Sequence, residues 1–241
     1  MQKTKKIIAV IPARGGSKGI PRKNIVKLSG HPLLAHTIFA AKNSKLVERI
    51  FVSTEDDEIA KVAKKYGAEV IKRPKRLAGD YVPSAPVVKD ALEQLEKREN
   101  YKADIVVYLQ PTDIFRKKGL IDEAIRKLLR NPKLDSVFSA YPTHKNFWEK
   151  KGKSYQRLTK KGLKLVRQKK EPIFREDTGI ASAVWAKVIK KGDRIGKMVG
   201  IIENDDELAF VDIHHPSDLW LAETIIKGLK KKKRLKDYEI L

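Results

Sequence analysis

The chain has 241 residues, 41% of them hydrophobic, and its 53 Lys and Arg against 30 Asp and Glu give a formal net charge of +23. This length and composition predict one globular domain spanning residues 1–241 and exclude a disordered chain. No run of 18 apolar residues is present, which argues against a membrane span, and the absence of cysteine excludes disulfides, thiolate metal sites and cysteine nucleophiles. We therefore expect a cytoplasmic protein.

Apolar runs and helical stripes alternate along the first 140 residues. Such runs predict strands covered on both faces, and the stripes between them predict amphipathic helices. The predicted strands are 7–11, 49–53, 105–109 and 135–140, and the apolar stripes between them span 34–41, 59–66, 87–95 and 121–128. Strands separated by helices predict an α/β fold with a mostly parallel sheet flanked by helices, whose ligands bind beyond the carboxyl ends of the strands.

The second predicted helix has clear boundary signals. Thr54 is placed to act as its N-cap, Asp57 follows three residues later, and Gly67 comes after its end. We therefore expect this helix to begin directly after Thr54.

The periodicity lapses from about Tyr141 to Asp177, where a polar, lysine-rich stretch predicts a hairpin-like excursion. The core pattern resumes at 180–185 and 198–202. A closing helix is expected after Pro216, because proline suits the first helical position.

The excess of positive charge has two interpretations. A field of +23 would attract nucleic acid or anionic small molecules. The alternative is a lysine-rich solvated surface, as in heat-adapted proteins. Because the basic residues are scattered along the chain, we favour the solvated surface and expect neither a nucleic-acid nor a membrane partner.

The strongest functional signal is the loop from Pro12 to Asn24, directly after the first predicted strand. It contains three glycines and four cations. Glycines allow backbone N–H groups to approach a polyanion closely, and the cations add the charge that a triphosphate requires. The spacing differs from that of the P-loop and of dinucleotide-binding loops. We favour a phosphate cradle over an ordinary glycine-rich turn.

The same loop, Ala13-Arg14-Gly15-Gly16-Ser17-Lys18-Gly19 followed by Lys23-Asn24, resembles the signature loop of the acylneuraminate cytidylyltransferases, the CMP-sialic acid synthetases. The similarity extends over nearly the whole chain. It continues at Val52–Asp56, Arg73-Pro74, Leu77-Ala78, Ser84, Leu109–Thr112 and Val211–Ile213.

The resemblance implies a Rossmann-like nucleotidyltransferase fold and transfer of CMP from CTP, with Mg²⁺, to the anomeric hydroxyl of a sialic-acid-like 2-keto sugar acid, releasing pyrophosphate. It also implies a homodimer in which the excursion at 141–177 reaches the partner subunit. Arg14, Lys18 and Lys23 are the expected catalytic residues. The nucleotide would be bound by Ala13, Arg14, Gly15, Gly16, Ser17, Lys18, Lys23, Asn24, Arg73 and Ser84. The acceptor would contact Gln110, Thr112 and Arg175, and the metal ligands would be Asp212 and Asp113.

The sequence departs from the family pattern at the acceptor and metal end. The usual Asp-Ile-Asp ends in His214, Asp113 replaces a serine, and the usual Asn-Gly-Ala-Ile-Tyr element, here 177–182, lacks its tyrosine. We hypothesise that Asp113 and Asp212 hold Mg²⁺ while His214 stays outside the ligand set, because Mg²⁺ prefers oxygen. The alternative role for Asp113 is that of a turn or N-cap residue.

Each site residue has a simpler alternative. Arg73 could be a surface loop cation, Ser84 a helix cap, Gln110 a partner for backbone at a strand end and Asp212 a turn acid, with His214 and His215 as loop histidines. The acceptor stays open between sialic, legionaminic and pseudaminic acids, a deoxy-octulosonate and a phosphonate. Two other classes also remain: a non-catalytic basic nucleic-acid-binding protein and a catalytically degenerate binding module. The complete cation loop argues against both.

Overall fold

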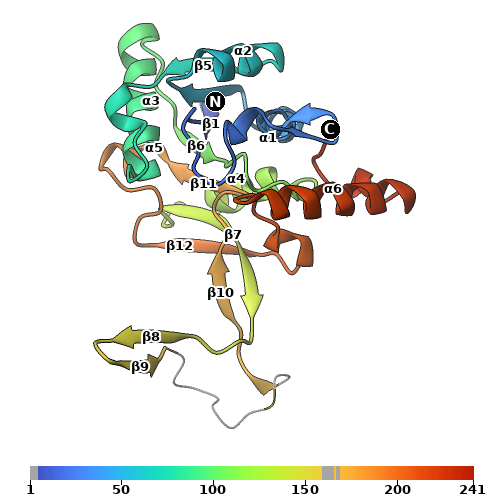
Figure 1. The fold of residues 1–241 in the computed structure, drawn as a ribbon. Helices are drawn as coiled ribbons and strands as arrows, with labels where there is room; N and C mark the ends of the chain where they lie inside the picture. The colour runs from blue at the N-terminus through green and yellow to red at the C-terminus, as the bar shows by residue number, and fades with distance from the viewer. Residues whose placement is uncertain (1–4, 159–165, 167–168) are drawn as a thin grey trace.

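An eight-stranded sheet forms the centre of the molecule, and the computed structural model describes residues 5–158, 166 and 169–241 (Figure 1). The strands follow the order β10-β7-β11-β6-β1-β4-β5, and β12 also pairs with β7. Their bounds are β1 (Ile7–Pro12), β4 (Arg49–Thr54), β5 (Glu69–Lys72), β6 (Ile105–Tyr108), β7 (Ser136–Thr143), β10 (Ile173–Glu176), β11 (Ser182–Trp185) and β12 (Val199–Glu203).

The sheet is mostly parallel, as predicted. β6, β1, β4 and β5 run parallel to one another, and β12 runs parallel to β7. β11 is antiparallel to both β6 and β7, and β10 is antiparallel to β7. The carboxyl ends of β1, β4 and β6 therefore meet at one edge, where a ligand is expected.

Helices cover both faces of the sheet (Figure 1). Along β1, Ala9 and Ile11 pack in one apolar cluster with α1, α2 and α4, whereas Ile8 and Val10 pack in a second cluster with α3 and α5. Because both faces of β1 are buried, its sequence is a continuous apolar run. The helices are α1 (Leu33–Asn43), α2 (Asp57–Lys65), α3 (Ser84–Glu99), α4 (Leu120–Arg130), α5 (Ala186–Lys190) and α6 (Pro216–Lys231).

The predicted start of α2 was wrong by two residues. β4 continues through Thr54, and the N-cap is Asp56, whose carboxylate accepts from the N–H groups of Glu58 and Ile59. The Thr54 hydroxyl instead accepts from the N–H of Asp56 at 3.1 Å. The N-cap is therefore a residue beyond the end of β4, and not the last residue of the strand.

The closing helix α6 begins at Pro216, as predicted. It packs in a third apolar cluster, through Ala222 and Ile226, against Ile114 and Phe115 from the segment after β6. The remaining short elements are β2 (Lys27–Leu28), β3 (His31–Pro32) and the 3-10 turns η1 (Lys23–Ile25), η2 (Lys75–Leu77), η4 (Glu207–Phe210) and η5 (Leu235–Asp237).

The predicted excursion projects from one end of the sheet (Figure 1). Its base is formed by β7, which extends past the predicted end at Ala140 to Thr143 because β10 pairs with residues 140–143. Beyond it, β8 (Trp148–Lys151) and β9 (Ser154–Arg157) form a two-stranded sheet. Residues 159–165 and 167–168 of the excursion lie outside the described residues.

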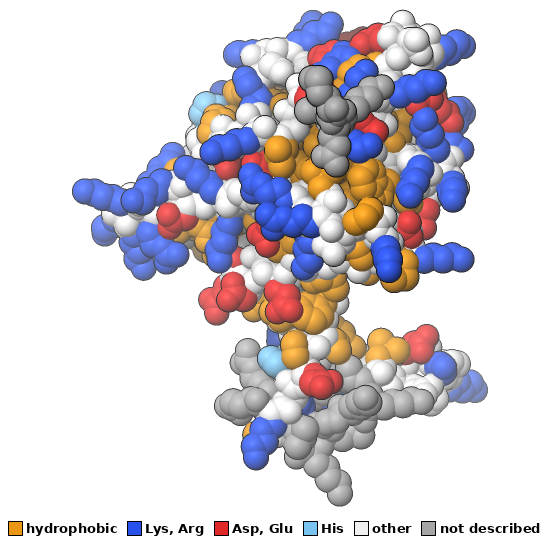
Figure 2. Space-filling model, turned by 180° about the vertical axis from the view of Figure 1, so that it is seen from behind, with side chains coloured by type: hydrophobic (Ala, Val, Ile, Leu, Met, Phe, Trp, Pro, Cys, Tyr) orange, Lys and Arg blue, Asp and Glu red, His pale blue; other side chains and the backbone are white. Residues whose placement is uncertain are grey.

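Basic side chains are spread over the surface and interleaved with acidic ones on the face shown in Figure 2. In the described part of the chain, no helix is long and apolar enough to cross a membrane.

Candidate active site

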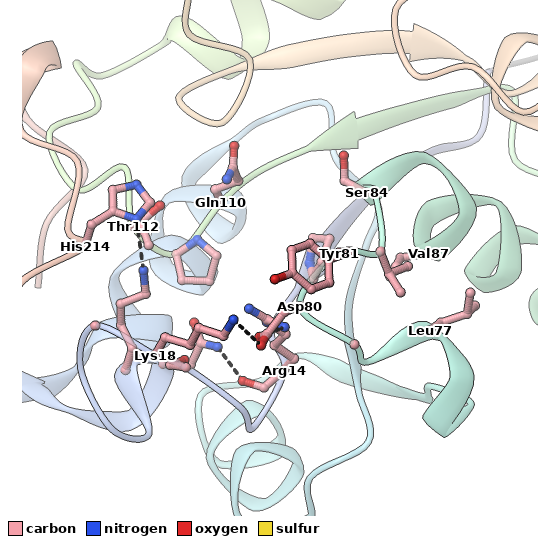
Figure 3. A pocket seen from close by; sticks show the side chains of 18 of the residues that line it. Arg14, Lys18, Leu77, Asp80, Tyr81, Ser84, Val87, Gln110, Thr112 and His214 are labelled. Carbon is pink, nitrogen blue, oxygen red and sulfur yellow. Dashed lines mark hydrogen bonds and ion pairs between the residues drawn. The ribbon is translucent and has the colours of Figure 1, made fainter.

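A cleft of about 540 Å³ opens at the carboxyl edge of β1, β4 and β6 (Figure 3). It is lined by the loop after β1, the segment from η2 to the start of α3, the residues after β6, and the turn before α6. The predicted site residues among its lining are Arg14, Ser17, Lys18, Lys23, Asn24, Arg73, Ser84, Gln110 and Thr112.

Two cations of the first loop, Arg14 and Lys18, contact the same carboxylate, that of Asp80, which was not predicted for the site. Asp80 lies 2.6 Å from Arg14 Nη1 and 3.0 Å from Lys18 Nζ, and these two cations hold the pKa of Asp80 below its usual range. Asn24 donates to the carbonyl of Arg14 at 2.8 Å, which orients the loop. The protein thus presents two cations to an anion at this end of the cleft.

Two of the three glycines in this loop lie in close contact with other segments of the chain. The N–H of Gly15 donates to Glu55 Oε1 at 2.7 Å, and a Cβ at Gly15 would lie 2.6 Å from an Asp56 oxygen. A Cβ at Gly19 would overlap the carbonyl of His214, whereas Gly16 has open space around it. Of these three glycines, only Gly16 therefore has room around it, since Gly15 and Gly19 are in tight contact with other segments.

Lys23 connects the phosphate loop to the segment before α6. Its Nζ donates to the carbonyl of Ile213 at 2.8 Å and lies 3.5 Å from His214 Nδ1. Burial lowers the pKa of Lys23, and the negative charge of Asp212 opposes that effect. The ammonium group of Lys23 therefore lies between the first loop and the segment that carries Asp212 and His214.

Ser84 lies at the opposite wall, near the apolar side chains of Leu77 and Val87 (Figure 3). Arg73 also lines the cleft. Arg73 is only 4% exposed and donates to Ser53 Oγ at 3.2 Å and to Ser53 O at 2.5 Å, and burial lowers its pKa. It is therefore not a surface cation. Ser84 is the first residue of α3, which begins without a side-chain cap, so the capping alternative was also wrong.

Asp113 and Asp212 adjoin Thr112 and His214, which line the other end of the cleft, and their backbones form an antiparallel bridge. Neither aspartate is itself among the residues that line the cleft. Burial, followed by the negative charge of Asp212, raises the pKa of Asp113 to about 7. Asp212 Oδ1 is buried and has no hydrogen-bond partner among the described residues, and its Oδ2 lies 2.7 Å from His214 Nε2. Two carboxylates that repel each other, one with an unpartnered oxygen, form a set that a cation would stabilise.

Arg175, which was expected to bind the acceptor, is not among the residues that line the cleft. Its guanidinium donates to both carboxylate oxygens of Asp177, at 2.8 and 3.0 Å, and to the carbonyl of Ala209 at 3.0 Å. It also lies 4.2 Å from the centre of the Phe210 ring. Through these three of its five N–H donors, Arg175 fastens β10 to η4.

The cleft is also lined by residues that were not predicted for the site, among them Asp80, Tyr81, His214 and His215. Tyr81 is 92% exposed, and Lys18 Nζ lies 5.2 Å from its ring centre. The two histidines were expected to be ordinary loop residues. Their position directly after Asp212 was the available signal, as was the position of Asp80 between the matched positions Leu77 and Ser84.

Comparison with known proteins places this geometry in a family. The family model described as cytidylyltransferase matches residues 8–225. The post-translational flagellin modification protein B of Campylobacter coli is 32% identical over 238 residues, which cover 96% of this chain and 99% of that protein. A pseudaminic acid cytidylyltransferase of Campylobacter jejuni is 39% identical over 148 residues, 59% of this chain and 63% of the relative.

A solved structure of CMP:2-keto-3-deoxy-manno-octonic acid synthetase complexed with CTP shares the fold. The TM-score is 0.69 at 15% identity, over 93% of this chain and 99% of that one. This likeness supports the Rossmann-like nucleotidyltransferase fold. The chain therefore belongs to the cytidylyltransferase family and is a nucleotidyltransferase of the acylneuraminate cytidylyltransferase type.

Proposed function

We propose that this chain transfers CMP from CTP to the anomeric hydroxyl of a sialic-acid-like 2-keto sugar acid and releases pyrophosphate. The observation that carries the proposal is that the cations Arg14, Lys18 and Lys23 line one cleft. The carboxylate pair Asp113 and Asp212 lies next to the lining residues Thr112 and His214, and the negative charge of both acts on Lys23. The pseudaminic acid cytidylyltransferase among the relatives supports this acceptor class.

The cations would bind the triphosphate. Arg14 and Lys18 now contact the carboxylate of Asp80, and a triphosphate carries more negative charge than that single group. In the reaction, the acceptor hydroxyl attacks the α-phosphorus and pyrophosphate leaves. Fixed cations stabilise the charge that spreads over the phosphate oxygens, so positioning and electrostatics supply most of the catalysis. Arg73 and Ser84 would hold the cytidine end.

Asp113 and Asp212 are the residues that would hold Mg²⁺. No group of three or more His, Asp or Glu side chains in residues 5–158, 166 and 169–241 is arranged to bind a metal ion. Mg²⁺ commonly uses one or two protein carboxylates together with substrate phosphates, so a pair suffices. When bound, the ion would neutralise charge on the phosphate oxygens. His214 would orient Asp212 through its hydrogen bond to Oδ2 without being a ligand.

Gln110 and Thr112, which line the cleft near the carboxylate pair, would contact the acceptor. The excursion would contact a second copy of the chain and so form a homodimer. The enzyme would act in the cytoplasm. It exposes Trp148 and Tyr155 at 59% and 66%, and aromatic side chains of this size are usually covered by a partner when they cluster.

The test is a screen for pyrophosphate release with each of the four nucleoside triphosphates, Mg²⁺ and a panel of acceptors. The panel contains pseudaminic, legionaminic, N-acetylneuraminic and deoxy-octulosonic acids and a phosphonate. We expect release with CTP and one of the nine-carbon sugar acids. Release only with the phosphonate or the octulosonic acid would favour those alternatives. No release with any pair, combined with salt-dependent binding to arbitrary DNA, would favour the nucleic-acid-binding alternative.

A further inference from the structure

A fully buried arginine lies behind the acceptor end of the cleft, and the proposed chemistry assigns it no role. Arg116, between β6 and α4, has an exposure of 0% and is the largest of the fully buried side chains among the described residues. Burial lowers its pKa to about 10, so the guanidinium keeps its charge at neutral pH. Because removing a cation from water is costly, a buried charge of this kind requires compensating contacts.

Neutral oxygens from three segments provide those contacts. Nε donates to the carbonyl of Ile180 at 2.7 Å, and Nη1 donates to the hydroxyl of Thr37 at 3.2 Å. Nη2 donates to the carbonyls of Gln110, at 2.5 Å, and Gly179, at 3.0 Å. The rigid fork of donors on a guanidinium is suited to joining several acceptors in fixed positions. Arg116 therefore ties the end of β6 to the turn before β11 and to α1.

These joined segments carry the side chains of the acceptor end. The N–H of Gln110 donates to the carbonyl of Gly179 at 3.0 Å. A Cβ at Gly179 would lie 2.5 Å from Gln110 Oε1 and would overlap the carboxylate of Asp113. The turn is thus packed directly against both side chains, so a shift of its backbone displaces Gln110 and Asp113 together.

The nucleotide end is anchored independently of Arg116. Arg73 is held by Ser53 at the end of β4, and the first loop is held by Asn24 and Glu55. None of the four side-chain hydrogen bonds of Arg116 reaches these residues. A loss of Arg116 therefore affects one end of the cleft selectively.

We infer that Arg116 is a positioning residue that clamps the Gln110–Asp113 segment to the turn at Gly179 and so sets the geometry in which the acceptor binds. The inference rests on the proposed function for the identity of the acceptor end. Arg116 touches no substrate itself and acts through Gln110 and Asp113.

The test compares Arg116→Met with the wild type under saturation by each substrate in turn. Since a displacement of about 1 Å in a positioning group can cost ~10²-fold in rate, we expect kcat/KM for the acceptor to fall by that order while KM for CTP changes less than about threefold. The matched control is Asp122→Asn, which removes a buried carboxylate that bonds Ser44 and Lys45 away from the cleft. It should lower the thermal midpoint without separating the two substrates.

Two further measurements keep the inference testable if Arg116→Met does not fold. Arg116→Lys retains a cation but lacks the fork, so it should show the same separation between acceptor and CTP. Amide hydrogen exchange without substrates should show loss of protection in 105–116 and 176–185, and not in β1 or β4.

Two outcomes would overturn the inference: a lower thermal midpoint with unchanged kinetic constants per folded enzyme, or an equal rise in KM for both substrates. A wild type that releases no pyrophosphate would instead refute the proposed function. The exchange measurement would then decide alone, and unchanged protection of both segments would refute the clamp.

Discussion

The two ends of the cleft differ in how their polar side chains are satisfied. At the nucleotide end, Arg14 and Lys18 pair with Asp80, which is one-third exposed, and a stronger anion can replace such a contact. At the acceptor end, Asp113 is half-buried beside Asp212, and Arg116 is fully buried among carbonyls. At the nucleotide end, the ion pairs can therefore exchange one anion for another, whereas at the acceptor end buried hydrogen bonds hold the side chains in place. Under the proposed function, we expect affinity for the nucleotide to depend on exposed charges and the choice of acceptor to depend on buried geometry.

The largest effect is expected from Lys23→Ala, because Lys23 serves both ends of the cleft. Loss of a cation that stabilises the transferring phosphate can cost ~10³-fold or more, so pyrophosphate release should nearly disappear. A matched control is Lys72→Ala, an exposed lysine that pairs with Asp57 outside the cleft. Activity at the control level in the Lys23 variant would show that the two ends are not coupled through this residue.

The next effect concerns the metal. Asp212→Asn and Asp113→Asn should raise the Mg²⁺ concentration needed for half-maximal activity by tenfold or more, because each variant removes a hard oxygen ligand. His214→Ala removes only a residue that orients a ligand. We expect it to raise that Mg²⁺ concentration by less than the ~10-fold that such a loss can cost. Mg²⁺ titration of the initial rate measures all three. If His214→Ala had the larger effect and Asp113→Asn the smaller, the carboxylate pair would not be the metal site.

A third comparison separates Gln110 from Arg175. Gln110→Ala should raise KM for the acceptor about tenfold, the equivalent of one hydrogen bond of ~1.4 kcal/mol. Arg175→Ala should change that KM by less than about twofold and lower the thermal midpoint instead, because three of its five N–H donors bind Asp177 and Ala209. Steady-state kinetics with the acceptor varied and thermal melting distinguish the two. An equal rise in KM would return Arg175 to the acceptor site.

A smaller effect of opposite sign is expected from Asp80→Asn. The carboxylate competes with the triphosphate for Arg14 and Lys18, so its loss should lower KM for CTP by about two- to fivefold, the range of an exposed ion pair. The gain should shrink as salt is added, because salt screens exposed charges. Titration of CTP at two ionic strengths is the measurement. A raised KM would mean that Asp80 supports the bound nucleotide.

The smallest effect on CTP binding is expected from Trp148→Ser in the excursion. If the exposed aromatic side chains of β8 and β9 contact a second copy, the variant should be a monomer by light scattering at micromolar concentration. KM for CTP should stay within about twofold, since the cleft is lined by residues outside the excursion. A wild-type monomer under the same conditions would contradict the predicted homodimer.

Much of the nucleotide end was predictable because its signals are local. Arg14, Lys18, Lys23 and Asn24 follow β1 within one loop, and a strand end in a parallel sheet is where a ligand is expected. Asp80 was the exception. Its partners lie in the first loop, far away along the chain, and no spacing rule connects it to them.

The sequence alone determined the alternation of strands and helices, the mostly parallel sheet and the edge at which the cleft opens, because apolar periodicity and turn residues act over short stretches of chain. Only the tertiary structure decided that Asp113 lies beside Asp212, that Arg175 donates to the carboxylate of Asp177 and that Arg116 is buried among carbonyls. The physical reason is that a charged side chain takes its partner from whatever group lies within about 3 Å in space. In this molecule the partners of the acceptor end come from segments after β6, before β11 and before α6, which meet only once the sheet has formed.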